Sequence, residues 1–179
     1  MPGQASMQDR RRHIRCPLPA AGALARSLAA VALLGCADAR ALDCLVSVTG
    51  VAFGVYDAVL TTPTDATGSL VVRCTHEGGR GMRLNYTVEL SPGNSGSYAR
   101  REMRSGQSVL GYNLFDSATY TRVWGNGTGG SGLVAGSLVV NPGNFSVNEF
   151  RHPIYGRIPA QQSVDTGAYS DTILVTLTF

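Results

Sequence analysis

Few residues in this sequence have the types and spacing that catalysis requires. Two histidines, His76 and His152, lie beyond the first forty positions, and both stand beside turn-forming residues, which favours surface positions. Asp165 and Asp171 are six residues apart across a turn, and Asp165-Thr166-Gly167 is typical of a turn rather than of an acid–base pair. The sequence has no G-x-S-x-G nucleophile motif. We therefore predict that the protein is not an enzyme.

Cofactor and metal chemistry are equally poorly supported. The glycine-rich stretch 125–132 lacks the Lys-Ser/Thr pair and the following helix of a phosphate-binding loop, so it predicts a flexible turn. Neither His76 nor His152 stands at zinc-ligand spacing from Cys44 or Cys74. We expect neither a cofactor nor a metal.

The basic charge of the chain belongs to its first forty residues. The formal net charge is +3, and all fifteen basic residues are arginines. Six of them, with two acidic residues, lie in the first forty positions, so the remainder carries nine arginines against ten acidic residues. A basic surface is the usual mark of a nucleic-acid partner, and the main part of the chain has none. We predict no nucleic-acid partner.

The first forty residues have the pattern of a secretory signal peptide. A positively charged segment at 10–15 is followed by the apolar run 28–34, which is too short to span a bilayer. Two overlapping A-x-A cleavage sites follow, formed by Ala37, Ala39 and Ala41. We predict a signal peptide at 1–39, cleaved after Ala39 or Ala41, and one domain at 42–179. Leu33-Leu34-Gly35-Cys36 resembles a lipoprotein cleavage site, which leaves acylation of Cys36 as an alternative to removal.

The cysteine count agrees with export. Cys16 and Cys36 belong to the leader, which leaves Cys44 and Cys74 as an even pair in an oxidising compartment. A disulfide between them would join two predicted strands and close a loop of about thirty residues. A zinc pair is the less favoured alternative, because no ligand-spaced histidine accompanies the cysteines.

The pattern of residues in the rest of the chain predicts short strands separated by turns. Strand-like patterns occur at 44–49, 51–56, 70–74, 82–91, 98–103, 109–115, 138–140, 150–159 and 172–179. The clearest is 82–91, where apolar and polar residues alternate without fault. Eight to ten short strands with no helical period predict an all-β protein built as a β-sandwich.

The final segment, 172–179, is the most hydrophobic strand and the one whose partners matter most. Ile173, Val175, Leu177 and Phe179 fall on one face with period two, and threonines dominate the other. An apolar strand of this kind needs a neighbour on both sides, because an open apolar edge promotes aggregation. The sequence leaves two sources for the second neighbour: this chain or another.

Seven short motifs, in order, make the chain resemble a known family. They are Phe53-Gly54-Val55-Tyr56-Asp57 after Cys44, Gly68-x-Leu70-Val71-Val72-x-Cys74, Tyr98-x-Arg100-x-x-Met103, Leu110-x-Tyr112-x-Leu114-Phe115, Val123-Trp124-Gly125-Asn126-Gly127-Thr128, Tyr155-Gly156-Arg157-Ile158-Pro159-Ala160-Gln161-Gln162 and Gly167-x-Tyr169-x-Asp171-Thr172. Together they resemble the spore coat U domain, which is shared with secreted subunits of archaic chaperone–usher pili of Gram-negative bacteria. The resemblance covers Cys44 to Phe179.

The resemblance implies both a fold and a function. The fold is an immunoglobulin-like sandwich that lacks its final strand and has a disulfide matching Cys44 and Cys74. Such subunits reach the cell surface through the periplasm and serve adhesion and biofilm formation. The missing strand leaves a groove beside the C-terminal strand, and Ile173, Val175, Leu177 and Phe179 are the residues expected to line it. A periplasmic chaperone fills this groove first, and a strand from another subunit, added at the outer-membrane usher, replaces the chaperone.

One feature departs from the polymerising pattern. Only Arg40 to Asp43, or Leu42 and Asp43, separate the cleavage sites from Cys44, which is shorter than a useful donor strand. The subunit is therefore expected to accept a strand and not to donate one, as a tip or starter. Tip proteins of this kind usually carry two domains, so a stand-alone secreted coat or carbohydrate-binding surface protein with a self-complete sandwich is the alternative.

Overall fold

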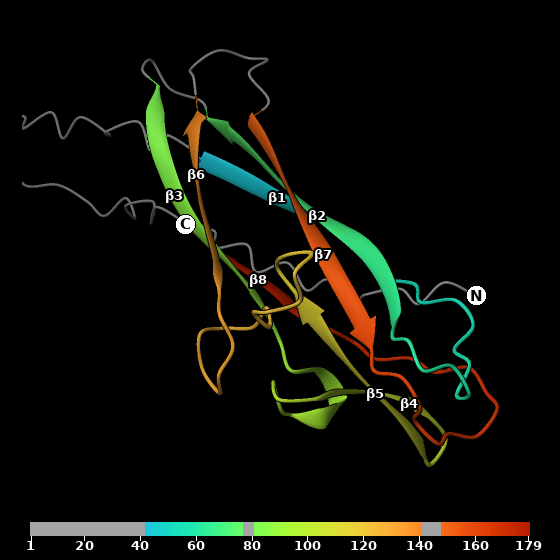
Figure 1. Ribbon diagram of the computed structural model, residues 1–179. Helices are drawn as coiled ribbons and strands as arrows, with labels where there is room; N and C mark the ends of the chain where they lie inside the picture. The colour runs from blue at the N-terminus through green and yellow to red at the C-terminus, as the bar shows by residue number, and fades with distance from the viewer. Residues whose placement is uncertain (1–41, 77–80, 141–147) are drawn as a thin grey trace, which may run out of the picture.

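The computed structural model describes residues 42–76, 81–140 and 148–179 (Figure 1). The predicted signal peptide, with Ala37, Ala39, Ala41 and Cys36, lies outside the described residues. The described residues form eight strands and one short 3-10 turn, in the order β1 (Leu42–Thr49), β2 (Thr64–His76), β3 (Met82–Leu90), η1 (Gly93–Ser95), β4 (Arg101–Ser105), β5 (Ser108–Phe115), β6 (Val134–Val140), β7 (Asn148–Ile158) and β8 (Val175–Thr178).

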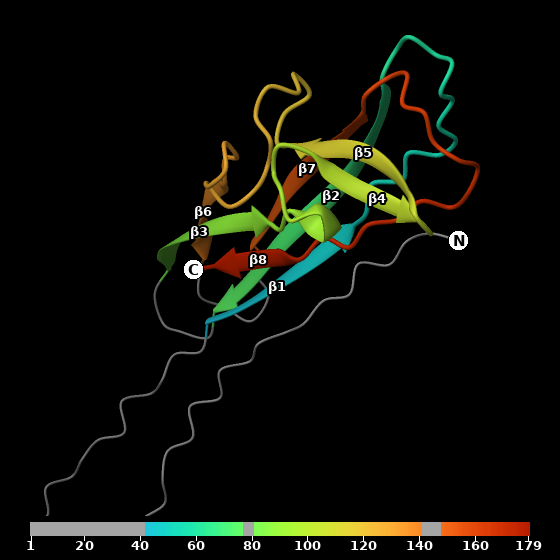
Figure 2. The ribbon, with the colours of Figure 1, turned by 90° about the horizontal axis from the view of Figure 1, so that it is seen from below.

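The strands form two antiparallel sheets that pack as a sandwich (Figures 1 and 2). The larger sheet has the order β1-β2-β7-β5-β4, and the smaller has the order β6-β3-β8. The predicted all-β sandwich is confirmed. Because consecutive strands often lie in different sheets, most contacts join residues far apart in the sequence.

Period-two alternation decides which side chains fill the core. In β3, Leu84, Tyr86, Val88 and Leu90 are buried and the residues between them are not, as the alternation predicts. Met82, predicted on the same inward face, is 38% exposed at the start of the strand. β2 contributes the fully buried Leu70, Val72 and Cys74 from the opposite sheet. The indole of Trp124 is also buried, and its N–H donates to the carbonyl of Val88, so this tryptophan packs in the core.

The predicted strand at 51–56 is wrong. Residues 50–57 follow β1 without regular strand pairing, and Gly54 has a positive φ of 73° that turns the chain. The segment is held by its side chains instead. A Cβ on Gly156 would lie 2.6 Å from Val51 and 2.7 Å from Phe53, so these two side chains fill the space that β7 leaves at its glycine. An apolar run can therefore serve the core by covering a glycine, without adding a strand.

The strands predicted at 70–74 and 138–140 are longer in the structure, as β2 and β6, and two others begin later than predicted. The segment predicted at 98–103 begins as a strand at Arg101, because the carbonyls of Tyr98 and Ala99 accept from the side-chain amide of Asn113. The final strand, predicted at 172–179, pairs only over Val175–Thr178.

The ends of the glycine-rich stretch 125–132 are held together by a backbone hydrogen bond, in which Gly125 N donates to the carbonyl of Gly132.

His152 is buried, contrary to the predicted surface position. It projects from β7 between the sheets and is 8% exposed. Its Nε2 lies 2.9 Å from the hydroxyl of Tyr86 in β3, and its ring packs edge-on against Trp124. A hydrogen bond therefore joins the two sheets across the core, and burial lowers the pKa of His152 from its ordinary value of 6.5.

We expect this histidine to make stability fall in mild acid. The folded protein binds a proton at His152 less readily than the unfolded chain, so stability that is fully present above pH 6.5 begins to fall below that value and is lost as the pH falls through the lower pKa of the folded state. Urea unfolding at about pH 7.5 and about pH 5.5 measures the difference, since histidines are the side chains that titrate there. His152→Gln should flatten the profile. An equal slope in this variant would contradict the prediction.

Candidate functional site

The candidate site lies between two sheet edges, β1 and β8. β1 is the edge of the larger sheet and pairs with β2, whereas β8 is the edge of the smaller sheet and pairs with β3. Figures 1 and 2 show that the two strands run in opposite directions, so that β1 starts near the point where β8 ends. Among the described strands, neither has a second partner. The backbone groups on the free side of each strand can therefore pair with an added strand.

The inward faces of both edge strands are incompletely covered. In β1, alternate residues are partly buried: Leu42, Cys44, Val46 and Val48. In β8 and the residue pair before it, Ile173, Val175 and Leu177 are partly buried and pack against the same core. The corresponding positions on the interior strands are fully buried, with Val72 of β2 and Val88 of β3 both 0% exposed. The apolar side chains at both edges are thus incompletely covered, and we call the inward residues of β1 and of the β8 segment, taken together, the β1–β8 groove.

The four residues predicted to line a groove do not all behave alike. Ile173, Val175 and Leu177 come together on the inward side, and each adjoins the core cluster. Phe179 is 55% exposed and lines a hollow on the outer face of the smaller sheet, with Thr178 beside it. The structure thus brings three of the predicted residues to the β1–β8 groove, and Phe179 lies at its end.

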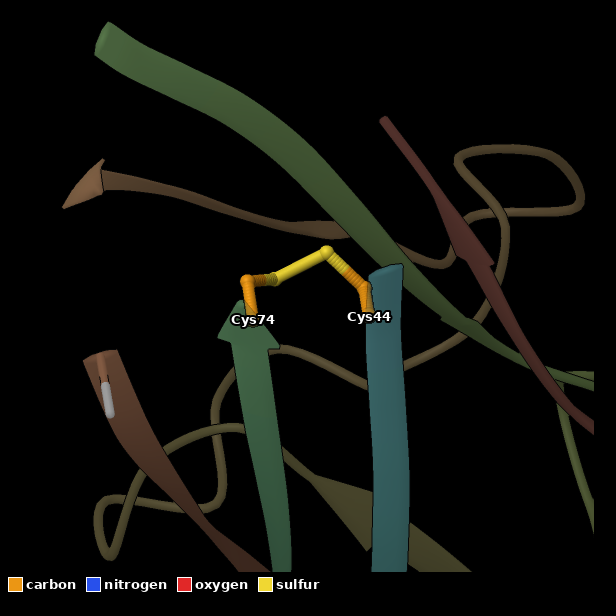
Figure 3. Close-up of a disulfide and its surroundings, with 2 residues drawn as sticks. All are labelled: Cys44 and Cys74. Carbon is orange, nitrogen blue, oxygen red and sulfur yellow. A yellow bond between two sulfur atoms is a disulfide. The ribbon is translucent and has the colours of Figure 1, made fainter. Parts of the chain in front are cut away.

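The disulfide fixes β1 at the groove. Cys44 and Cys74 are directly opposite each other in the antiparallel pairing of β1 with β2, and they form the disulfide that the sequence predicted (Figure 3). Cys74 is fully buried, whereas Cys44 is partly buried on the groove side. The bridge therefore holds the open edge strand β1 covalently against β2.

A carboxylate holds the start of the β8 segment. Asp171 accepts from the Tyr112 hydroxyl at 2.7 Å and from the backbone N–H groups of Asn94 and Thr172 at 2.9 and 2.8 Å. Burial, followed by this hydrogen bond and the charge of the carboxylate, raises the pKa of Tyr112. The hydroxyl therefore stays protonated as a donor. These contacts tie the segment before β8 to β5 and to the turn after β3.

The turn after β3 aligns the next residues of the β8 segment. Ser91 N donates to the carbonyl of Leu174, and Leu174 N donates to the Ser91 hydroxyl, both at 2.9 Å. The pairing of β3 with β8 follows immediately, from Leu90 opposite Val175 to Thr87 opposite Thr178. These fixed contacts set which side chains of β8 face the groove, since a slip of one residue would reverse the two faces.

A buried arginine supports the same turn, and the sequence reasoning missed it. Arg101 is 0% exposed, and its guanidinium donates to the carbonyls of Ser91 and Trp124 and to Asn113 Oδ1, at 2.7 to 3.1 Å. Burial lowers the pKa of Arg101 from its usual value. The signal was present in the alternation, because period two places Arg101 on the same face as the buried Met103.

The described residues offer little for other chemistry. Within 42–76, 81–140 and 148–179, no group of three or more histidine, cysteine, aspartate or glutamate side chains could hold a metal ion. No helix in this part of the chain has the length and apolar character needed to cross a bilayer. The β1–β8 groove is the feature that the fold presents most clearly to a partner.

Comparisons with known proteins agree with the fold. A solved chain from the chaperone–tip adhesion subunit pre-assembly complex of archaic chaperone–usher Csu pili of Acinetobacter baumannii matches with a TM-score of 0.51 and 24% sequence identity. The match covers 78% of this chain but 40% of the solved chain, so this protein spans less than half of that chain's length. At this identity the likeness supports the fold alone.

The sequence comparisons identify the family. Protein U of Myxococcus xanthus is 31% identical over 134 residues, which cover 71% of this chain and 70% of the relative. The family model described as the Spore Coat Protein U domain matches residues 30–176, most of the chain. With its two-sheet sandwich and its disulfide, the protein belongs to the Spore Coat Protein U domain family.

Proposed function

We propose that this protein is a secreted structural subunit of a cell-surface pilus, and that it accepts a β-strand from a partner in the β1–β8 groove. The observation that carries the proposal is the incomplete burial of apolar side chains on the facing edges of both sheets, while the interior strands are fully covered. A strand with alternating apolar residues would cover these side chains and pair with both free backbone edges.

The geometry restricts how such a strand enters. Because β1 and β8 run in opposite directions, a strand between them must be parallel to one and antiparallel to the other (Figure 2). Antiparallel pairing with β8 is slightly more stable per residue and continues the antiparallel smaller sheet. Its inward side chains would then lie between Val46 and Val48 on one side and Val175 and Leu177 on the other.

By analogy with that chaperone–tip subunit complex, we propose a sequence of partners. A periplasmic chaperone would cover the groove first, and another pilus subunit would replace it at the outer-membrane usher. In this proposal the protein reaches the surface of a Gram-negative cell and serves adhesion or biofilm formation. We propose no enzymatic role, cofactor or nucleic-acid partner.

The likeness to Protein U favours one other function. Protein U is matched over 70% of its length, and the family takes its name from a spore coat protein. A stand-alone secreted coat protein would need a sandwich that is stable without a partner strand. The two functions therefore differ in whether the domain is stable by itself.

Coexpression tests the proposed function. We expect the mature chain to aggregate or be degraded when it is produced alone in a bacterial periplasm. A chaperone of the chaperone–usher class should rescue it as a soluble one-to-one complex, detected by size-exclusion chromatography. The chain with Leu177→Asp should fail to form that complex, because a charge in the groove opposes burial, and Thr176→Asp on the exposed face is the matched control. If the chain produced alone is a soluble monomer that unfolds cooperatively and does not bind the chaperone, the result would favour the stand-alone coat protein.

We also propose that the first 39 or 41 residues are removed on export. Cleavage after Ala39 or Ala41 would leave a mature chain beginning at Arg40 or Leu42, directly before β1. Intact mass of the exported protein, with and without reductant, should show one of these ends and a gain of two hydrogens on reduction. A diacylglycerol mass on Cys36 would overturn the cleavage proposal.

A further inference from the structure

The outer face of the smaller sheet carries a hollow that the groove does not use. Its volume is about 610 Å³, and strands β3, β6 and β8 all contribute to it. The lining residues are Asn85, Tyr86, Thr87, Ala135, Gly136, Ser137, Thr178 and Phe179. The cross-strand pairs Asn85 with Ser137 and Thr87 with Thr178 bring three strands to one place.

The lining side chains are uncharged, and the lined surface is mostly apolar with amide and hydroxyl groups set within it. Asn85, Ser137 and Thr178 are exposed, so their amide and hydroxyl groups can both donate to and accept from a ligand. Phe179 is 55% exposed and offers an apolar ring beside them. No lining side chain carries a charge, although Arg83 and Glu89 continue the same face of β3 on either side.

Small residues keep the hollow open. Ala135 and Gly136 contribute almost no side-chain volume from β6. A Cβ on Gly136 would lie 2.3 Å from the Tyr86 ring, which crosses over this glycine to reach His152 inside the sandwich. The glycine is therefore fixed by the core, and the space on its outer side remains available.

We propose that this hollow is a binding site for a neutral carbohydrate. Sugar hydroxyls both donate and accept, as the lining amide and hydroxyl groups do, and a sugar ring presents C–H groups that pack on an aromatic side chain. A concave surface with a few convergent polar groups is the usual form of a small-ligand site. The exposed lining residues Asn85, Ser137 and Thr178 face away from the core, whereas the groove residues of β1 and β8 face it, and only Phe179 lies near both.

Saturation-transfer NMR with maltotriose, cellotriose and chitotriose at millimolar concentration tests the proposal. The protein is used as it purifies, with its chaperone if the two copurify, and the chaperone alone serves as the blank. We expect saturation transfer to at least one of the three trisaccharides. Ala135→Leu, which fills the hollow, should abolish it, and Asn85→Ala should weaken binding about three- to tenfold, as the loss of one hydrogen bond does.

Ser47→Leu is the matched control, because it adds the same side chain to the exposed outer face of β1 in the other sheet. It should leave binding unchanged. Trigalacturonate is the charged comparison and should bind no better than the neutral sugars. The proposal is overturned by absence of transfer to all three neutral sugars, by equal transfer in Ala135→Leu, or by a clear preference for the charged sugar.

Discussion

Filling the β1–β8 groove should raise the melting temperature of this protein by about 15 °C. The expected gain is about 5 kcal/mol, because an inserted strand buries its own apolar side chains, at about 1.5–3 kcal/mol each, and finishes covering those of the two edge strands. The partly buried side chains that would gain cover are Leu42, Val46, Val48, Ile173, Val175 and Leu177. An effect of this size is comparable to the whole stability of many domains, which is about 5–15 kcal/mol.

A covalent fusion is the clearest way to make the measurement. A strand with alternating apolar residues, joined to Phe179 by a short turn, would fold back antiparallel to β8 and enter the groove. The fusion avoids the cost of bringing two molecules together, which is about 4–15 kcal/mol for a separate peptide. Thermal unfolding of the fused chain and of the unfused chain, the latter refolded from denaturant at low concentration, gives the shift.

Two matched changes decide whether the groove is responsible. Shifting the donor sequence by one residue reverses its faces and should remove the gain without changing composition. Val175→Asp should remove it as well, whereas Thr176→Asp, on the exposed face of β8, should retain most of it. Because Val175→Asp can also unfold the chain, the shifted donor is the decisive control. A melting temperature that does not change with a correctly phased donor would show that the sandwich is complete without one.

Replacing Arg101 by alanine should cost about 3–5 kcal/mol of unfolding free energy. The substitution leaves the carbonyls of Ser91 and Trp124 without their donor, and each unsatisfied group costs about 1–3 kcal/mol. The amide oxygen of Asn113 loses one donor and keeps the other, the backbone N–H of Leu114. The site has 0% exposure, so water cannot replace the guanidinium without entering the core. Chemical denaturation of the donor-fused chain provides a well-defined baseline for the comparison.

Arg104→Ala is the matched control for Arg101→Ala. Arg104 lies in the same strand, but its side chain is 47% exposed and its ion pair with Glu102 is on the surface, where such pairs contribute about 0–1 kcal/mol. Arg101→Lys should recover part of the loss, since an ammonium can reach one or two of the acceptors. If both alanine variants lost the same free energy, the buried network would not be what stabilises the turn after β3.

Local alternation was enough to predict the class of fold and much of the core. The pattern in β3 gives its buried face correctly because a strand places successive side chains on opposite sides whatever its partners are. Counting cysteines after removal of the leader gave Cys44 and Cys74, and the structure joins them. The same alternation placed Ile173, Val175 and Leu177 on one face, and they do pack toward the core.

What the sequence could not determine depends on contacts between distant segments. The apolar run 51–56 has a strand-like composition, but its role follows from glycines in β2 and β7, which lie far along the chain and need to be covered. His152 stands beside turn-forming residues in the sequence, which predicted a surface position. Arg101 shares the alternating face of Met103, but its charge gives no reason to expect burial. Only the hydrogen-bond partners that distant segments supply make the burial of these two side chains tolerable.

The open groove itself is also a property of the tertiary structure. A period of two fixes which face of a strand is apolar, but it does not say which strand lies beside it, because pairing is set by topology over more than a hundred residues. The sequence therefore determined that the final strand needed cover, and the arrangement of β1 and β8 on facing edges decided that the cover is incomplete. The physical reason is that side-chain alternation is local, whereas backbone pairing and burial are satisfied only between segments brought together by folding.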